Sequence, residues 1–153
     1  MFKNKDLFAL SGRAVVLLLA VVTIASTTFA QLSLRKAMDF NGDGRADFSI
    51  YRQSNNIWYT LQSNGVPIFT NFGIAGIDYI TPADFDGDGK ADVAVFRELD
   101  GVWFWLNSSN GTFSSFQWGS PGDEALSRDF DGDGKSDVAV VRRSNALMIW
   151  FIF

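Results

Sequence analysis

The feature that most constrains this chain is a nine-residue acidic loop motif that occurs three times. In the copy at 84–92, aspartates occupy loop positions 1, 3, 5 and 9, and glycines occupy positions 4 and 6. Ca²⁺ is a hard cation that takes about six to eight oxygen ligands, and carboxylates packed this closely repel one another when no cation is present. Glycine permits the tight curl that brings them together. The motif predicts a calcium loop, with the carbonyl at position 7 as a main-chain ligand.

The other copies lie at 39–47 and 129–137, so the three motifs repeat with a fixed spacing of 45 residues. A period of about 40–45 residues is typical of a four-stranded propeller blade. This regularity disfavours the alternative of three solvated acidic turns, and we expect about three Ca²⁺ ions, one per loop. The predicted metal-binding residues, with position 7 contributing its carbonyl, are Asp39, Asn41, Asp43, Arg45 and Asp47; Asp84, Asp86, Asp88, Lys90 and Asp92; and Asp129, Asp131, Asp133, Lys135 and Asp137.

Short apolar segments with alternating large and small residues follow each loop, and this pattern predicts β-strands. An aromatic segment and a further strand come next, and a short segment (79–81 or 125–127) leads into the following loop. We assign that short segment to the repeat that it follows. The chain is therefore predicted to be all-β, with blades of four antiparallel strands, and residues 31–153 supply about 2.7 such blades.

Several residues recur at fixed places in the repeat, and we expect structural roles for them. The tryptophans are predicted to form the core between blades, because aromatic side chains dominate core burial. The phenylalanine at loop position 2 is predicted to point into the blade interface, and the arginine at the strand end to satisfy carboxylates or carbonyls. These residues are Trp58, Trp103, Trp105 and Trp118; Phe40, Phe85 and Phe130; and Arg52, Arg97 and Arg142.

The first thirty residues have the pattern of a cleaved secretory signal peptide. A basic start is followed by an apolar run at 14–25 and by the small residues Thr28 and Ala30 before Gln31. The run falls short of the roughly 20 residues that a spanning helix needs, which makes an uncleaved anchor the weaker alternative. We therefore expect a secreted mature chain, 31–153, without a membrane span. The chain has no cysteine, so we expect bound calcium, rather than disulfides, to stabilise the fold.

The charge pattern argues against a nucleic-acid partner. The chain has 13 basic and 17 acidic residues, and eleven of the acids lie in the three loops. No run of Lys or Arg marks a nucleic-acid surface. Without residues 1–30 the net charge is −6, which three Ca²⁺ ions would cancel.

The repeat resembles the FG-GAP family (VCBS-type repeats), the calcium-binding blades of integrin α-chain propellers and many secreted bacterial proteins. The loops match, and so do the segments 72–76 (Phe-Gly-Ile-Ala-Gly) and, more loosely, 118–122. The resemblance covers the chain from about Leu32 and implies metal ligands at the loop positions given above, with a weaker first site because Asn41 replaces a carboxylate. An EF-hand fits worse, since the residue at its position 12 here is Ile50, Val95 or Val140 rather than Glu.

The resemblance implies a secreted, non-catalytic module that binds an extracellular protein or glycan through blade-edge loops. The alternatives are a fragment of a propeller-type polysaccharide lyase or hydrolase, and a truncated gene remnant. The acids outside the loops form no evident acid–base pair, which favours a non-enzyme. They are Asp78, Glu98, Asp100, Asp123 and Glu124.

Closed propellers have about four to eight blades, more than this chain supplies. A longer protein, several chains completing a ring, or a short open stack would each account for the difference. The apolar C-terminal segment 150–153 is predicted to leave an exposed edge, and such an edge invites self-association.

Overall fold

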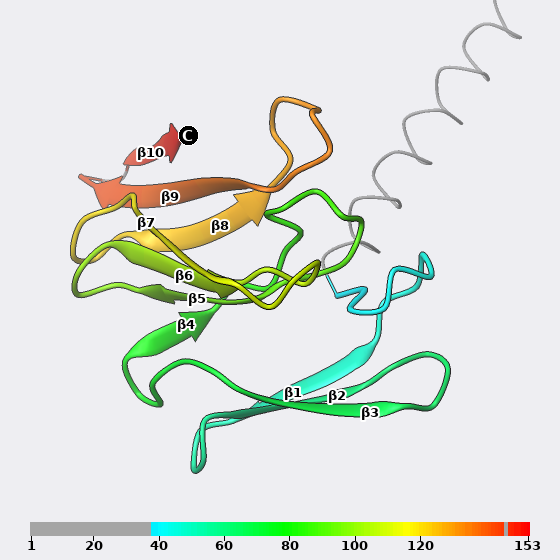
Figure 1. Ribbon diagram of the computed structural model, residues 1–153. Helices are drawn as coiled ribbons and strands as arrows, with labels where there is room; N and C mark the ends of the chain where they lie inside the picture. The colour runs from blue at the N-terminus through cyan, green and yellow to red at the C-terminus, as the bar shows by residue number, and fades with distance from the viewer. Residues whose placement is uncertain (1–37, 146) are drawn as a thin grey trace, which may run out of the picture. The chain divides into compact units, whose positions relative to one another are not determined.

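A computed structural model describes residues 38–145 and 147–153. The predicted signal peptide lies outside these residues. The described part contains ten β-strands and no helix, and therefore no helix long and apolar enough to cross a membrane. The strands form three antiparallel sheets that follow one another in space in chain order (Figure 1). The all-β prediction is confirmed.

The first sheet has the order β1-β2-β3, with β1 at Phe48–Arg52, β2 at Ile57–Leu61 and β3 at Pro67–Asn71. Trp58 on β2 is 1% exposed, and its indole Nε1 donates to the carbonyl of Phe72 at 3.1 Å. The alternation of buried and exposed residues along β2 shows that this sheet covers a core on one of its faces.

The second sheet has four strands in the order β4-β5-β6-β7. They are β4 (Asp78–Ile80), β5 (Val93–Arg97), β6 (Val102–Leu106) and β7 (Phe113–Gln117). The third sheet has the order β10-β9-β8, with β8 at Glu124–Arg128, β9 at Asp137–Ser144 and β10 at Leu147–Ile152. Within the described residues, the predicted four-stranded sheet is present once and the other two sheets have three strands.

The short strand before the second loop and the one before the third each join the sheet that follows, so our assignment of 79–81 and 125–127 to the preceding repeat is wrong. β4 pairs with β5, and β8 pairs with β9. The physical reason is an ion pair across each junction. Arg97 donates to the fully buried carboxylate of Asp78 at 2.8 and 3.1 Å, and Arg142 binds Asp123 in the same way at 2.7 and 2.8 Å. The structural role predicted for these two arginines is confirmed.

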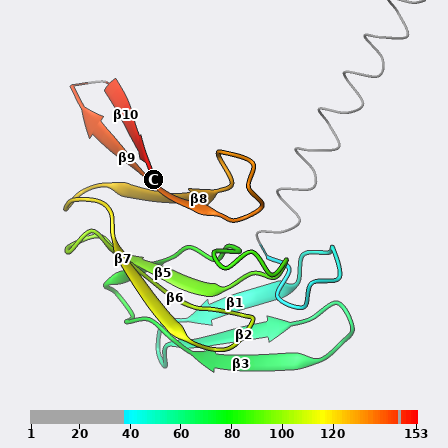
Figure 2. The ribbon, with the colours of Figure 1, turned by 45° about the horizontal axis from the view of Figure 1, so that its top comes forward.

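The main core lies between the second and third sheets. Phe96, Trp103, Val138 and Val140 form one buried cluster. Trp103 is fully buried, and its Nε1 donates to the carbonyl of Trp118 at 2.9 Å. The core prediction is confirmed for Trp58 and Trp103, whereas Trp105 and Trp118 are partly buried and pack against the cluster. Figure 2 shows the same succession of sheets from a tilted direction.

Two glycines allow the turns after β3 and β7 to lie against the next sheet. Gly73 has a φ of +92°, and a Cβ there would come within 3.0 Å of Val95 Cγ1. A Cβ on Gly119 would come within 3.1 Å of Phe96 and 3.3 Å of Val140. The glycine of the Phe-Gly segment that resembles the family motif thus has a local reason: its φ favours glycine, and a Cβ at this position would force the Val95 side chain to shift.

The phenylalanine at loop position 2 behaves differently in the second and third loops. Phe85 stacks on Trp105 with ring centroids 4.9 Å apart and also contacts Trp103, as predicted. Phe130 is 40% exposed, so the prediction is wrong there. In the described residues no fourth sheet follows the third, and Phe130 has no interface to enter.

Candidate metal centre

All three loops wrap around the carboxylate at position 1. In the first loop, the N–H groups of Gly42 and Gly44 donate to the two oxygens of Asp39, each at 2.7 Å. Equivalent pairs bind Asp84 and Asp129 in the other loops. Every glycine at positions 4 and 6 has a positive φ, which side-chain-bearing residues rarely adopt. The predicted curl is therefore present in each loop.

Positions 3 and 5 each accept the backbone N–H two residues later, an arrangement known as an Asx turn. The N–H of Asp88 donates to Asp86 at 3.1 Å, and that of Lys90 donates to Asp88 at 2.9 Å. The first and third loops repeat both bonds. The residues at position 7 thus brace the loop through their N–H groups.

Two of the loops gather acidic side chains closely enough to share a cation. Oxygens of Asp84, Asp86 and Asp88 all lie within 4.8 Å of one another. A second group combines Asp129, Asp131 and Asp137 in the same way. These two aspartate clusters could hold a metal ion. The first loop, which lies wholly within the described residues, has Asn41 at position 3, and its three aspartates do not form such a group.

The aspartate at position 9 is a buried anchor in the first two loops. Asp92 is fully buried; one oxygen accepts the N–H of Phe85 at 2.8 Å, and the other accepts the N–H of Ser108 at 2.7 Å. Asp47 makes the same two contacts, with Phe40 and Ser63. Position 9 therefore closes the loop and ties it to the turn between the second and third strands that follow it, β2 and β3 in the first sheet and β6 and β7 in the second. In the second loop, Asp92 lies outside the aspartate cluster.

The electrostatics of the second loop favour a cation. Burial raises the pKa of Asp84 above its ordinary value, and the charges of Asp88 and Asp86 raise it further. Burial also raises the pKa of Asp92 to about 6. A group whose pKa is raised in this way disfavours its own ionisation. A divalent cation at the cluster would stabilise the ionised carboxylates and remove that penalty.

Sequence reasoning missed the serines that support the loop carboxylates. The hydroxyl of Ser63 donates to Asp43, and that of Ser108 donates to Asp88 at 2.8 Å. Ser109 donates to Asp86 at 2.6 Å. Ser63 and Ser108 are one repeat apart, so the same 45-residue period that located the loops also contained this signal.

Successive loops are joined to one another in a row. The N–H of Ala91 donates to the carbonyl of Asp39 at 2.7 Å, and the N–H of Ser136 donates to that of Asp84 at 2.6 Å. The Lys90 side chain passes over Gly42, and Lys135 passes over Gly87. Position 8 of each loop therefore binds position 1 of the loop before it, and the residue at position 7 covers the glycine at position 4.

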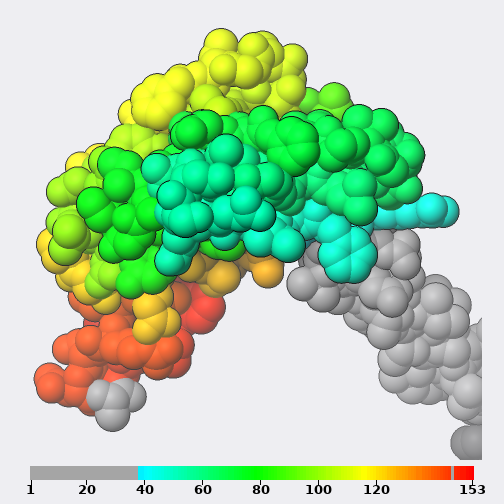
Figure 3. All heavy atoms as spheres, turned by 90° about the horizontal axis from the view of Figure 1, so that it is seen from below, coloured from blue at the N-terminus to red at the C-terminus, as the bar shows by residue number. Residues whose placement is uncertain are grey.

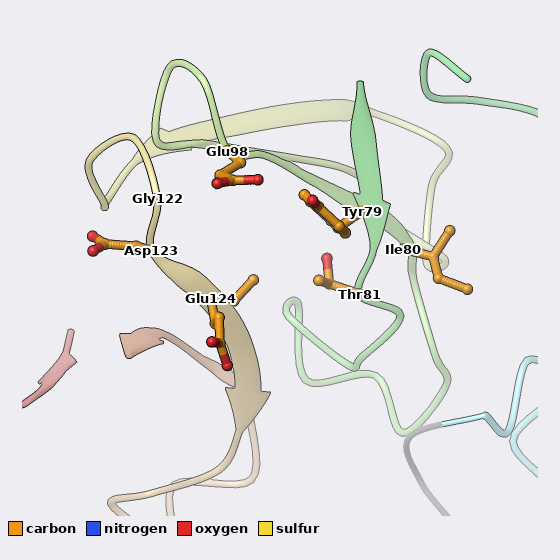
Figure 4. A pocket seen from close by; sticks show the side chains of 8 residues that line it. Tyr79, Ile80, Thr81, Glu98, Gly122, Asp123 and Glu124 are labelled. Atoms are coloured by element: carbon orange, nitrogen blue, oxygen red, sulfur yellow. The ribbon is translucent and has the colours of Figure 1, made fainter. Parts of the chain in front are cut away.

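Three of the acids outside the loops lie around one cavity of about 410 Å³ (Figure 4). Glu98, Asp123 and Glu124 line it together with Tyr79 and Thr81. Arginine partners lower the pKa of Asp123 and of Glu124 below their ordinary values. Both groups therefore stay ionised at neutral pH, whereas a glycosidase general acid requires a raised pKa.

Residues 39–95 match the family model described as FG-GAP-like repeat. The match contains the first two loops, and the resemblance is confirmed for this segment. No curated protein and no solved structure gives a significant match. The third loop lies beyond the matched segment, but it has the same spacing and the same internal hydrogen bonds.

Proposed function

We propose that this chain is a secreted, non-catalytic repeat module in which Ca²⁺, bound by the acidic loops, stabilises propeller-type blades that bind an extracellular protein or glycan. An FG-GAP-like repeat at 39–95 is consistent with a repeat or adhesion-type module. The observation that carries the metal proposal is the pair of aspartate clusters, each with its oxygens within 4.8 Å of one another.

Calcium suits these clusters better than magnesium. The loops offer several carboxylates and a carbonyl from one short segment, and Ca²⁺ accepts many oxygen ligands in a flexible geometry. Mg²⁺ prefers a strict octahedron and retains several waters. Extracellular calcium modules bind at about 10⁻⁴–10⁻³ M, an affinity that is useful only outside the cell.

The blade proposal rests on how the sheets contact one another. The second and third sheets are in contact face to face through Trp103, Val138 and Val140, and the three loops are joined to one another in a row. A radial array of small antiparallel sheets is the organisation of a β-propeller. The three sheets would be its consecutive blades.

Titration calorimetry tests the metal proposal. We expect heat on adding Ca²⁺, a weaker response to Mg²⁺, and binding weakened by Asp86→Asn and by Asp131→Asn. Glu124→Gln is the control, because this acid lies outside the loops, and it should bind as the unmodified chain does. At a calcium concentration one hundred times Kd, each filled site adds about 2.7 kcal/mol of stability. An unchanged melting temperature in EDTA would refute the stabilising role.

Secretion and partner binding have their own tests. N-terminal sequencing of the exported protein should begin at Gln31 if residues 1–30 are a signal peptide. A glycan array or a cell-binding assay should give a signal that EDTA abolishes. Binding that persists in EDTA would show that partner recognition does not require the calcium-stabilised loops.

The acid-lined cavity is the one feature that favours an enzyme, a fragment of a polysaccharide lyase or hydrolase. The Tyr79 hydroxyl donates to the Glu98 carboxylate, which raises the pKa of that hydroxyl and keeps Tyr79 protonated at neutral pH, so that it is not available as a base. The low pKa values of Asp123 and Glu124 argue against either as a general acid. Turnover in a polysaccharide-degradation screen that is lost in Glu98→Gln would establish the enzyme instead.

A further inference from the structure

We propose that two copies of this chain associate head to tail, with the outer face of the sheet β8–β10 of one copy stacked on the outer face of the sheet β1–β3 of the other. The proposal concerns self-recognition and does not depend on metal binding. It rests on the contact between sheets within one chain. The two outer faces carry residues at the positions that make this internal contact, so the same contact could form between two copies.

The internal contact sets a tryptophan of one sheet against small apolar residues of the next. Trp103, opposite Phe96 in the strand pairing, lies in one buried cluster with Val138 and Val140. Trp58 is buried in the equivalent place on the first sheet, opposite Tyr51. The second sheet therefore meets the third through its tryptophan face, the third meets it through the face that carries Val138 and Val140, and the first sheet carries its tryptophan in the same place.

The third sheet exposes the tryptophan face. Trp150 pairs with Val141, which is the position of Phe96 and Tyr51 in the other sheets. Trp150 is nevertheless 49% exposed, whereas the two equivalent tryptophans are 0% and 1% exposed. Sequence spacing alone would have aligned Met148 with Trp103; the β9–β10 pairing is displaced by two residues and brings Trp150 to this place.

The first sheet exposes the face that corresponds to the one carrying Val93 and Val95 in the second sheet, and here that face is apolar and partly aromatic. Phe48 and Ile50 stand one repeat before Val93 and Val95 and two repeats before Val138 and Val140, and they are 83% and 69% exposed. With Tyr59, Leu61 and Phe69 they line an apolar hollow of about 380 Å³. Figure 3 looks onto the molecule from this side, where the cyan and green atoms of the first sheet face the viewer.

The loop row continues across the same junction. Within the chain, lysine side chains cover Gly42 and Gly87, but nothing lies within 4 Å of the equivalent position on Gly132. Arg45, which occupies the place of those lysines in the first loop, is exposed. Arg45 of the second copy would cover Gly132 and bring a positive charge to the acidic third loop. The N–H of Ala46 would meet the carbonyl of Asp129.

Such a junction is heterologous, because different surfaces of the two copies meet, and heterologous contacts form either rings or open filaments. The described parts of two copies supply six sheets, within the range of about four to eight blades in closed propellers. A dimer is therefore the smallest assembly in which both junctions close. Its contact is face to face, unlike the addition of a strand at the free edge of β10.

Light scattering after size exclusion tests the proposal on protein purified from cells that express the full chain, over a wide concentration range with and without Ca²⁺. We expect a dimer, and we expect Trp150→Lys and Ile50→Lys each to weaken dimerisation at least about tenfold, as hot-spot residues do. Leu99→Lys is the control, since Leu99 is 68% exposed in the turn between β5 and β6, away from both faces.

Mixing the two variants distinguishes this junction from a symmetric one. Each variant keeps one intact face, so an equimolar mixture should form a heterodimer through a single junction, although neither variant dimerises alone. Circular dichroism confirms that each variant is folded. A monomer at every concentration, association that neither substitution weakens, or no rescue on mixing would overturn the proposal. Loss of Ca²⁺ binding with the dimer retained would count only against the proposed function.

Discussion

The substitution Trp103→Phe separates the two contributions of the tryptophan core. Trp103 is fully buried, its Nε1 donates to the carbonyl of Trp118 at 2.9 Å, and its ring lies 5.1 Å from that of Phe96. Phenylalanine keeps an aromatic ring in place but removes the donor and part of the ring. The carbonyl is then left without its partner inside the core.

The expected decrease in the free energy of unfolding is large for a substitution of one aromatic residue by another. An unpaired buried acceptor costs about 1–3 kcal/mol, and the lost apolar atoms, with the space they leave, cost roughly 1–2 kcal/mol. A total of about 2–4 kcal/mol is a substantial part of the roughly 5–15 kcal/mol that stabilises a typical domain. For a domain of this size we expect the melting temperature to fall by roughly 6–20 °C.

Urea unfolding followed by far-ultraviolet circular dichroism, at one fixed calcium concentration and in dilute protein, measures the loss. Trp58→Phe should cost a similar amount, because Trp58 is 1% exposed and its Nε1 donates to the Phe72 carbonyl at 3.1 Å. Trp150→Phe is the control and should cost less than about 0.5 kcal/mol, as exposed substitutions do. Equal losses of stability in Trp103→Phe and Trp150→Phe would refute the assignment of Trp103 to a buried face and of Trp150 to an exposed one.

Three further predictions concern the polar groups. Arg97→Lys should destabilise the chain by at least about 2 kcal/mol in thermal unfolding, because it weakens the pairing of a fully buried carboxylate, whereas Arg143→Lys, in an exposed pair, should cost less than about 0.5 kcal/mol. Ser108→Ala should lower stability by about 1 kcal/mol and weaken calcium binding in calorimetry, because the hydroxyl that supports Asp88 is lost. In EDTA, the folded pKa of Asp92, about 6, lies above the unfolded value of 3.8, so its contribution to stability should fall as the pH rises from about 4 to 6; a carboxyl titration midpoint near 4 by NMR would contradict this.

The loop conformations could be predicted from the sequence because they are determined locally. Glycines at positions 4 and 6 permit the positive φ values, and the side chains at positions 1, 3 and 5 accept N–H groups from within the same nine residues. No distant residue is needed to explain this curl. The all-β class followed from a similarly local property, the alternation of apolar residues along each strand.

The partition into sheets could not be predicted in the same way, because it depends on a contact between residues far apart in sequence. Asp78 and Arg97 are separated by a whole calcium loop, yet their ion pair fixes β4 beside β5. Both residues recur one repeat later, as Asp123 and Arg142. The period therefore contains the pairing, which can be found only when the two recurring positions are considered together.

The same nine-residue motif has three different environments, and the cause is the loop that follows it. Asp39 and Asp84 are 1% and 4% exposed, and in each case the next loop donates an N–H to the carbonyl of that residue. Asp129, whose carbonyl no later loop of the described chain reaches, is exposed. A buried carboxylate pays more to be ionised and gains more from a nearby cation. The burial of a loop, and with it the affinity of the loop for a cation, is therefore determined by the next loop in the row as much as by the loop's own residues. For this reason the motif alone cannot predict which of the three sites binds a cation most tightly.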